Sequence, residues 1–184
     1  MSKIIGIDLG TTFSAIAQLD DLGNPEVLAS TDTNKKITAS AVYLKEKNVV
    51  VGDKALDGLN ATPKNVVTET KRQMENDVVF STQKGEWIDK EGAEEGCYSP
   101  AQVSSFILGK LKEYTSDIKK VVITVPALFA EKARVATLDA AKMAGIEVIE
   151  LINEPTAAAC YYASLPAVKK ITGKVLVFDL GGGT

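Results

Sequence analysis

The second half of the sequence alternates between short apolar runs and longer stretches in which apolar residues recur every three or four positions. The short runs cover residues 120–125, 146–152 and 174–180 and are typical of buried strands, whereas the stretches between them have helical spacing. Strands that are joined through helices run parallel in one sheet, because a parallel connection needs a long crossover. This alternation therefore restricts the chain to an α/β fold.

Local signals mark where these helices begin and end. Ser99-Pro100-Ala101-Gln102 combines a capping residue, a proline at the first helical position and a glutamine at the third, which predicts a capping box and a helix from Pro100. A second helix is expected over residues 130–144, because Gly145 takes the usual position after a helix end. Pro155 opens a third helix that includes residues 157–163.

The first part of the chain predicts an antiparallel meander. Its expected strands span residues 3–9, 14–19 and 26–30, with turn residues between them. Residues 37–96 have a less regular pattern of apolar residues. They contain short strand-like pieces, a helical piece at 53–60 and an exposed, glycine- and acid-rich loop at 85–96. Antiparallel strands followed by strand–helix alternation are the layout of a ribonuclease-H-like (actin-like ATPase) lobe. We therefore expect a mixed five-stranded sheet with flanking helices and an inserted small α+β subdomain.

Composition excludes several kinds of chemistry. The chain has 21 basic and 24 acidic residues and a net charge of −3, which argues against a nucleic-acid partner. It has no histidine, so Ser-His-Asp catalysis, Cys-His catalysis and histidine-bound zinc are excluded. Cys97 and Cys160 do not make a disulfide framework. Because no run approaches the roughly eighteen apolar residues of a membrane span and no signal-peptide pattern is present, we expect a cytoplasmic protein without a membrane partner.

Asp8-Leu9-Gly10-Thr11-Thr12 closes the first apolar run. A strand that ends in an acid and then a glycine turn exposes backbone N–H groups and two hydroxyls, which can cradle phosphate oxygens. The Asp8 carboxylate can hold the waters of a Mg²⁺ ion, which prefers carboxylates and its own hydration shell. A single Asp-Leu-Gly sequence is also common as an ordinary turn.

Asp179-Leu180-Gly181-Gly182-Gly183-Thr184 repeats this pattern after the last apolar run. Three glycines allow the backbone to approach a ligand closely, although a flexible tail has the same composition. Two opposed phosphate loops around one nucleotide require two copies of such a sequence. The repetition therefore favours phosphate binding over a tail.

Four motifs occur together in the chain. They are Ile7-Asp8-Leu9-Gly10-Thr11-Thr12, Ile123-Thr124-Val125-Pro126-Ala127, Ile152-Asn153-Glu154-Pro155-Thr156-Ala157-Ala158-Ala159 and residues 179–184. In this order the chain resembles the DnaK-type heat-shock chaperones of the seventy-kilodalton heat-shock protein family, as a divergent member, over essentially its whole length. The third motif is the most specific, since sugar kinases, acetate kinases and actins share the two phosphate loops. The resemblance implies the N-terminal lobe of a nucleotide-binding domain.

The family layout also implies a division of the chain. Residues 1–36 and 97–169 would form the ribonuclease-H-like subdomain of the first lobe, and residues 37–96 a shortened inserted subdomain. Residues 170–184 would supply the first strand and the phosphate loop of a second lobe.

The resemblance assigns roles to individual residues. Lys71, Glu154 and Asp179 would be catalytic: Lys71 stabilises charge on the γ-phosphoryl group, and Glu154 hydrogen-bonds nearby waters. Asp8 and Asp179 would position a hydrated Mg²⁺ ion. The residues expected to bind ATP or ADP are Asp8, Gly10, Thr11, Thr12, Phe13, Gly181, Gly182, Gly183 and Thr184. Pro126 and Arg134 match a relay between the nucleotide and client sites.

Each of these assignments has a plainer alternative. Lys71 can be a solvated helical lysine, and Glu154 can be an acid favoured at a helix N-terminus. Pro126 can simply end a strand, and Arg134 can be a surface charge.

The resemblance implies the ATP-binding and ATP-hydrolysing domain of a chaperone that uses ATP turnover to control the binding of unfolded polypeptides. Its expected cofactors are ATP or ADP and Mg²⁺. Its expected partners are unfolded clients, bound through a C-terminal domain, together with J-domain proteins and nucleotide-exchange factors. The 184 residues alone are expected to hydrolyse little ATP, because the family holds the adenosine with a second lobe. An actin-like small-molecule kinase and a non-catalytic interaction scaffold are the alternatives.

Overall fold

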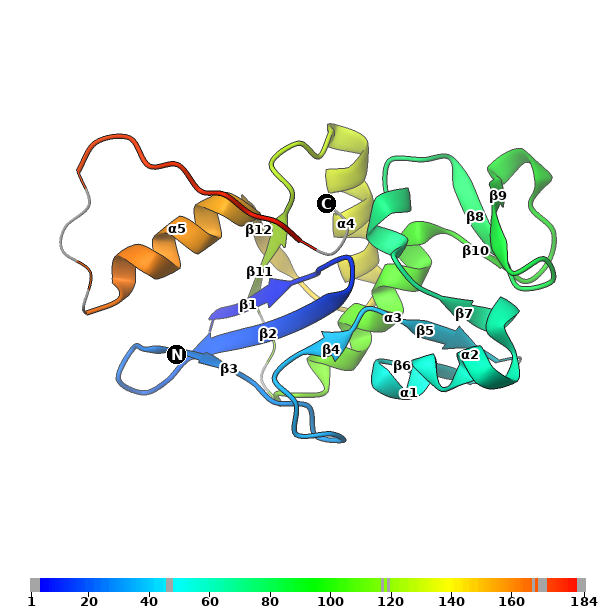
Figure 1. Ribbon diagram of the computed structural model, residues 1–184, viewed down its shortest axis with the longest axis horizontal. Helices are drawn as coiled ribbons and strands as arrows, with labels where there is room; N and C mark the ends of the chain where they lie inside the picture. The colour runs from blue at the N-terminus through cyan, green and yellow to red at the C-terminus, as the bar shows by residue number, and fades with distance from the viewer. Residues whose placement is uncertain are drawn as a thin grey trace.

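The computed structural model describes residues 4–45, 48–116, 118, 120–166, 168 and 172–181. Its centre is a mixed sheet in the order β12-β11-β1-β2-β3 (Figure 1). These strands are β1 (Ile4–Asp8), β2 (Phe13–Leu19), β3 (Pro25–Val27), β11 (Lys120–Val125) and β12 (Val148–Asn153). β11 pairs in parallel with β1 and β12, whereas β2 pairs antiparallel with β1 and β3. The expected mixed sheet is confirmed, and β4 (Thr38–Ala39) adds a sixth strand by pairing with the start of β2.

Two long helices pack against this sheet (Figure 1). α3 (Pro100–Lys112) begins with the predicted capping box, in which the Ser99 hydroxyl accepts from Gln102 N at 3.2 Å and Ser99 N donates to Gln102 Oε1 at 2.8 Å. α4 (Glu131–Met143) ends two residues before Gly145, whose φ of 66° lies in the left-handed region that favours glycine. None of the helices in the described part of the chain combines the length and the apolar character needed to cross a bilayer.

Strand alternation separates a core face of the sheet from an open face. In β1, Ile5 and Ile7 are buried, whereas Gly6 and Asp8 point to the other side. The main core also contains Ile16, Val103, Ile107, Leu108, Leu111, Val121, Ile123 and Ala140. Burying a large aliphatic side chain contributes about 1.5–3 kcal/mol, so this face holds the sheet to α3 and α4. The open face is left for the site described below.

Two small antiparallel sheets occupy the middle of the chain. One has the order β6-β5-β7 and the other β10-β8-β9. Their strands are β5 (Val42–Leu44), β6 (Val49–Val51), β7 (Val66–Val67), β8 (Val78–Ser81), β9 (Glu86–Asp89) and β10 (Cys97–Tyr98). The short helices are α1 (Asp53–Leu56), α2 (Gly58–Ala61), η1 (Pro63–Asn65), η2 (Thr70–Gln73) and η3 (Lys90–Gly92).

The helical piece expected at 53–60 is confirmed, as two short helices, α1 and α2, with Asp57 between them. The loop expected at 85–96 is wrong in part, because this stretch contains β9, which pairs with β8. Trp87 of β9 stacks edge-on against Phe80 at 5.5 Å between ring centroids, and this aromatic contact outweighs the glycine- and acid-rich composition.

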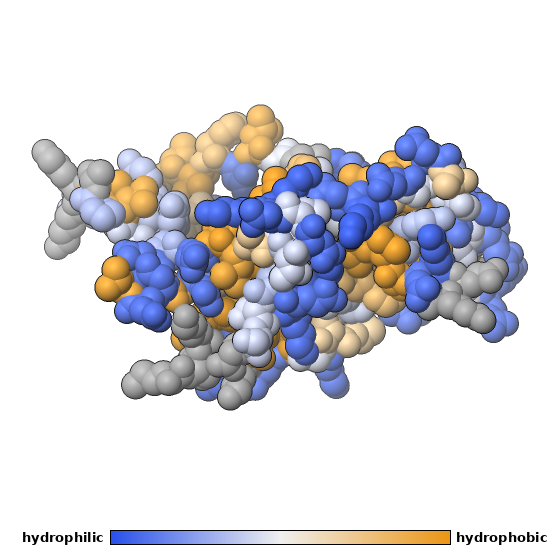
Figure 2. Space-filling view, turned by 90° about the horizontal axis from the view of Figure 1, so that it is seen from below, coloured by the Kyte–Doolittle hydropathy of each residue, from blue (hydrophilic) through white to orange (hydrophobic). Residues whose placement is uncertain are grey.

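The strand expected over residues 174–180 is also wrong. After α5 (Glu154–Ser164), residues 174–181 run alongside the helix as an extended segment without strand pairing (Figure 1). The side chains of Leu176, Phe178 and Leu180 are 92%, 85% and 86% exposed. An apolar run becomes a buried strand only beside a partner strand, and none of the described residues pairs with this one. In the view from below, hydrophobic patches interrupt the hydrophilic surface of the molecule (Figure 2).

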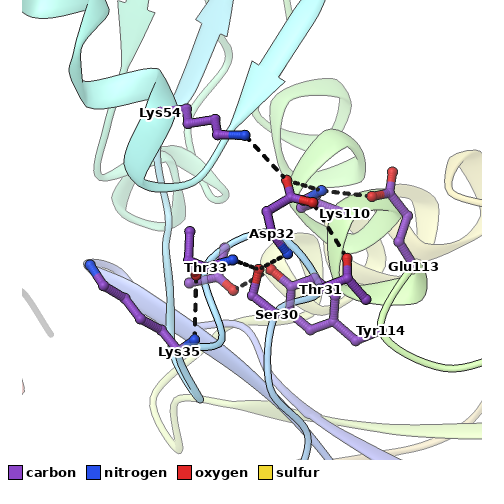
Figure 3. Close-up of polar contacts among 10 residues, drawn as sticks. Ser30, Thr31, Asp32, Thr33, Lys35, Lys54, Lys110, Glu113 and Tyr114 are labelled. Carbon is purple, nitrogen blue, oxygen red and sulfur yellow. Dashed lines mark hydrogen bonds and ion pairs between the residues drawn. The ribbon is translucent and has the colours of Figure 1, made fainter.

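An ionic cluster ties the loop after β3 to α1 and α3 (Figure 3). Asp32 lies 2.9 Å from the Lys110 ammonium and 3.9 Å from that of Lys54, and Lys110 also contacts Glu113 at 2.7 Å. The hydrogen bond and charge of Lys110 hold the pKa of Asp32 below its usual value. Burial tends to lower the pKa of Lys110, but its bonds to Glu113 and Asp32 outweigh burial and raise that pKa. These ion pairs therefore connect the loop after β3 to both α1 and α3.

Candidate nucleotide site

A cavity of about 680 Å³ lies on the open face of the sheet, next to the β1–β2 turn and α5. Nine of the predicted site residues line it: Asp8, Gly10, Thr11, Thr12, Phe13, Lys71, Glu154, Asp179 and Gly181. Gly182, Gly183 and Thr184 lie outside the described residues. The fold thus brings both Asp-Leu-Gly sequences to one cavity, although the second is not preceded by a strand.

The turn between β1 and β2 has a tight backbone. A Cβ atom at position 10 would lie 2.0 Å from the backbone oxygen of Phe13, so only glycine fits there. Just before the turn, the Asp8 carboxylate accepts a hydrogen bond of 2.7 Å from the Thr124 hydroxyl. Asp8 and Thr124 are partners in the parallel register of β1 and β11. Strand pairing therefore sets the position of the acid.

Lys71 is buried and ion-paired. It belongs to η2, and its side chain is 6% exposed. The ammonium donates to Glu154 Oε1, which offsets the cost of burying the charge. The alternative of a solvated helical lysine is therefore wrong. Glu154 opens α5, so it also occupies the favourable N-terminal position for an acid.

Phe129 links this ion pair to α4. The Lys71 ammonium lies 6.0 Å from the centroid of the Phe129 ring. Arg134 donates through Nε to the Phe129 carbonyl at 3.2 Å and through Nη2 to Asn153 Oδ1 at 2.7 Å. Since Asn153 directly precedes Glu154, the contacts form a closed path from Lys71 through Phe129 and Arg134 back to Glu154.

Pro126 and Arg134 are not among the residues that line the cavity. Pro126 follows β11, and its carbonyl accepts from Phe129 N at 3.1 Å. Both residues thus reach the site through Phe129. A second tie comes from Glu75, whose carboxylate accepts from Ala130 N at 3.0 Å where α4 begins. The chain just after Lys71 is thereby attached to the same helix.

The carboxylates present fit a hydrated magnesium ion. Asp8 and Asp179 both line the cavity. The described residues contain no group of three or more histidine, cysteine or acidic side chains that could hold a metal by themselves. Mg²⁺ keeps several waters and usually takes one or two carboxylates together with substrate phosphates, so two acids suffice.

Sequence reasoning missed Thr124, Phe129 and Asn153. Thr124 and Asn153 stand inside two of the four motifs, but Thr124 lies near Asp8 because β11 pairs with β1, which the sequence did not predict. Phe129 has no comparable signal. Its position depends on the turn after β11, which combines a local bond from Phe129 N to the Pro126 carbonyl with the bond from Ala130 N to Glu75.

Comparison with known proteins gives a consistent result. The family described as Hsp70 protein matches residues 4–184. The chain is similar to a chaperone protein DnaK from Mycoplasmopsis agalactiae, with 42% identity over 186 residues that cover 98% of the chain and 28% of the relative. A chaperone protein DnaK from Nitrosopumilus maritimus is 39% identical over 193 residues, covering 100% of the chain and 28% of the relative.

A mitochondrial-type heat shock protein 70 from Encephalitozoon hellem is 38% identical over 204 residues, which cover 100% of the chain and 33% of the relative. The chain thus spans about a third or less of the length of these curated relatives. The family match begins at β1 and continues past Asp179, so it includes every segment that contributes to the cavity. The chain belongs to the Hsp70 family.

Proposed function

We propose that the chain forms the N-terminal part of an ATP-binding and ATP-hydrolysing domain in a molecular chaperone, which uses ATP turnover to control the binding of unfolded polypeptides. The observation that carries this proposal is the buried Lys71–Glu154 pair, which lines the same cavity as Asp8 and the turn at residues 10–12. A fixed positive charge beside a turn rich in backbone donors suits phosphoryl transfer, because charge in that transition state is spread over phosphate oxygens.

In this proposal the first turn holds the β- and γ-phosphates through the backbone and the hydroxyls of Thr11 and Thr12. Lys71 places its ammonium against the γ-phosphoryl group, where its stabilising effect grows as charge develops. Glu154 orients Lys71 and accepts a hydrogen bond from the attacking water. Asp179 and Gly181 approach the phosphates from the other side, and residues 182–184 complete that loop.

Asp8 and Asp179 would hold a hydrated Mg²⁺ ion, and Thr124 would keep the Asp8 carboxylate in place. Bound with ATP, the ion offsets the charge of the phosphates. The chain would contribute both carboxylates, and it holds that of Asp8 in place before the nucleotide binds through the bond from Thr124.

The chaperone part of the proposal comes from the relatives, whose names are those of DnaK and heat shock protein 70. We extend their chaperone role to this protein, with unfolded polypeptides, J-domain proteins and nucleotide-exchange factors as partners. Pro126 and Arg134 are proposed to relay the state of the site to such partners. Their shared contact with Phe129, next to Lys71, supports this role.

The test is Lys71→Ala in the full-length protein. We expect hydrolysis at saturating ATP to fall about a hundredfold or more, because the variant loses a donor that acts mainly in the transition state. ATP affinity, measured by calorimetry, should stay nearly unchanged. Phosphate release with water as the only acceptor separates an ATPase from a small-molecule kinase, which needs a second substrate.

Lys132→Ala is the matched control. Lys132 also pairs with an acid, Asp77 at 2.8 Å, but it is not one of the residues lining the cavity. This variant should leave both rate and affinity unchanged. Loss of ATP binding by Lys71→Ala with a normal saturated rate would contradict the role of Lys71. A wild-type protein that binds no ATP at all would favour the interaction scaffold.

A further inference from the structure

Behind the β1–β2 turn lies a pair of buried serines, Ser14 and Ser40, to which the phosphate chemistry above assigns no role. Ser14 is 1% exposed and Ser40 is 4% exposed. Their hydroxyl oxygens lie 2.8 Å apart, and Ser40 Oγ donates to the Gly10 carbonyl at 2.8 Å. Neither serine lines the cavity, whereas Gly10 does.

The hydrogen bonds have a fixed direction. A serine hydroxyl has one hydrogen, and Ser40 uses it on the Gly10 carbonyl. Ser14 must therefore be the donor in the bond between the two hydroxyls. Ser14 therefore donates to Ser40, and Ser40 donates to Gly10. Both hydrogen bonds require the Ser40 hydroxyl.

Ser40 also binds the turn through its backbone. Ser40 N donates to the Thr12 carbonyl at 2.8 Å, because β4 pairs with the start of β2. One residue therefore holds two carbonyls of the turn, those of Gly10 and Thr12, on the side away from the cavity. In a planar trans peptide the N–H points opposite to the C=O. Fixing these carbonyls thus directs the next N–H groups, those of Thr11 and Phe13, away from Ser40.

We propose that Ser40, supported by Ser14, is a positioning residue that aims the backbone N–H groups of the β1–β2 turn at the phosphates of the bound nucleotide. The proposal rests on the proposed function, since it needs a phosphate ligand in the cavity. The backbone N–H donors are already ordered before the ligand binds, so binding does not carry the entropic cost of ordering them. Without the Ser40 hydroxyl, the Gly10 carbonyl loses its partner and this peptide can rotate.

The experiment measures the dissociation constants of ADP and adenosine, both with Mg²⁺, for the full-length protein and its variants. Adenosine has no phosphates, so it cannot use the turn. Ser40→Ala should weaken ADP binding about tenfold, the effect of losing one well-placed hydrogen bond, and leave adenosine binding unchanged within about twofold. For Ser40→Cys, the dissociation constant of ADP should lie between those of the wild type and Ser40→Ala, because cysteine is similar in size to serine but a weaker hydrogen-bond donor. Ser14→Ala should have a smaller effect, because it leaves the bond to Gly10 in place.

Ser30→Ala is the control. Ser30 is a buried serine whose hydroxyl accepts from the backbone of Asp32 and Thr33, far along the chain from the turn (Figure 3). It should lower the melting temperature without changing the ratio of the two constants. The positioning role alone is overturned if Ser40→Ala weakens the binding of ADP and of adenosine equally. It is also overturned if Ser40→Cys leaves the ratio of the two dissociation constants unchanged. A wild-type protein with no preference for ADP overturns the proposed function first, and the positioning role with it.

Discussion

The two Asp-Leu-Gly sequences of this chain have nearly the same residues but very different surroundings. Before Asp8, Ile5 and Ile7 of β1 are 0% and 1% exposed, and β1 is paired on both edges, with β2 and β11. Before Asp179, Leu176 and Phe178 are 92% and 85% exposed, and no described strand pairs with them. The first turn is therefore held by the fold, whereas the second only lies against the cavity.

This difference shows that the motif determines which backbone and side-chain groups a loop contains. The residues packed around the loop determine whether those groups have a fixed geometry. The first turn has Thr124 behind its acid and Ser40 behind its carbonyls. An apolar run gains its stability from what covers it, so equal sequences need not be equally ordered.

The largest difference between the two segments is expected when one apolar side chain before each motif is truncated. In the 184-residue chain, Ile7→Ala should lower the free energy of unfolding by about 2–5 kcal/mol, because it leaves a hole in the core. Phe178→Ala should change it by less than about 0.5 kcal/mol, as for other exposed sites. Urea unfolding of both variants measures the two values. Similar losses would mean that both segments are equally held.

A smaller effect is expected from adding one methyl group to the first turn. Gly10→Ala should cost about 1–3 kcal/mol of unfolding free energy, because its Cβ meets the Phe13 oxygen and the backbone must shift. Gly6→Ala is the control, since a Cβ at Gly6 has nothing within 4 Å. Thermal unfolding of the two variants provides the measurement. A Gly10→Ala protein as stable as Gly6→Ala would show that the turn is not rigid.

The smallest effect concerns charge, and it tests the ion pairs that join the loop after β3 to α1 and α3. The pKa of Asp32 is held below its usual value by Lys110, so its stabilising effect is present at neutral pH and is lost as pH falls through the lowered pKa. Asp32→Asn should therefore melt earlier than wild type at pH 7, and the gap should close below about pH 4. Exposed Asp57→Asn should lower the melting temperature less. A gap that persists in acid would point to packing instead of charge.

The elements with strong local signals could be predicted from sequence. The capping box at Ser99, the glycine after α4 and the strand at residues 120–125 all lie where expected, because short-range chemistry sets them. The strand expected over residues 174–180 failed because an apolar run does not say whether a partner is present. β9 was missed because its support, the contact of Trp87 with Phe80, is made across the hairpin.

The residues lining the site were easier to predict than those holding it. Asp8 belongs to a motif whose chemistry can be read along the chain, and Lys71 was assigned through the family resemblance. Thr124, Phe129 and Ser40 act on neighbours that are distant in sequence. Their side chains are ordinary for a strand, a turn and a buried strand end, so only the folded structure distinguishes them.

The parallel pairing of β1 with β11 has a consequence for synthesis. Asp8 and Thr124 are 116 residues apart, and a ribosome adds about 5–20 residues per second, so Asp8 leaves the ribosome about 6–23 s before Thr124 does. During that interval β1 can pair with β2, but its other edge is open to any extended chain. Until Thr124 is synthesised, the β1–β2 turn therefore lacks the hydrogen bond that positions Asp8. The turn gains its final geometry only when β11 pairs with β1.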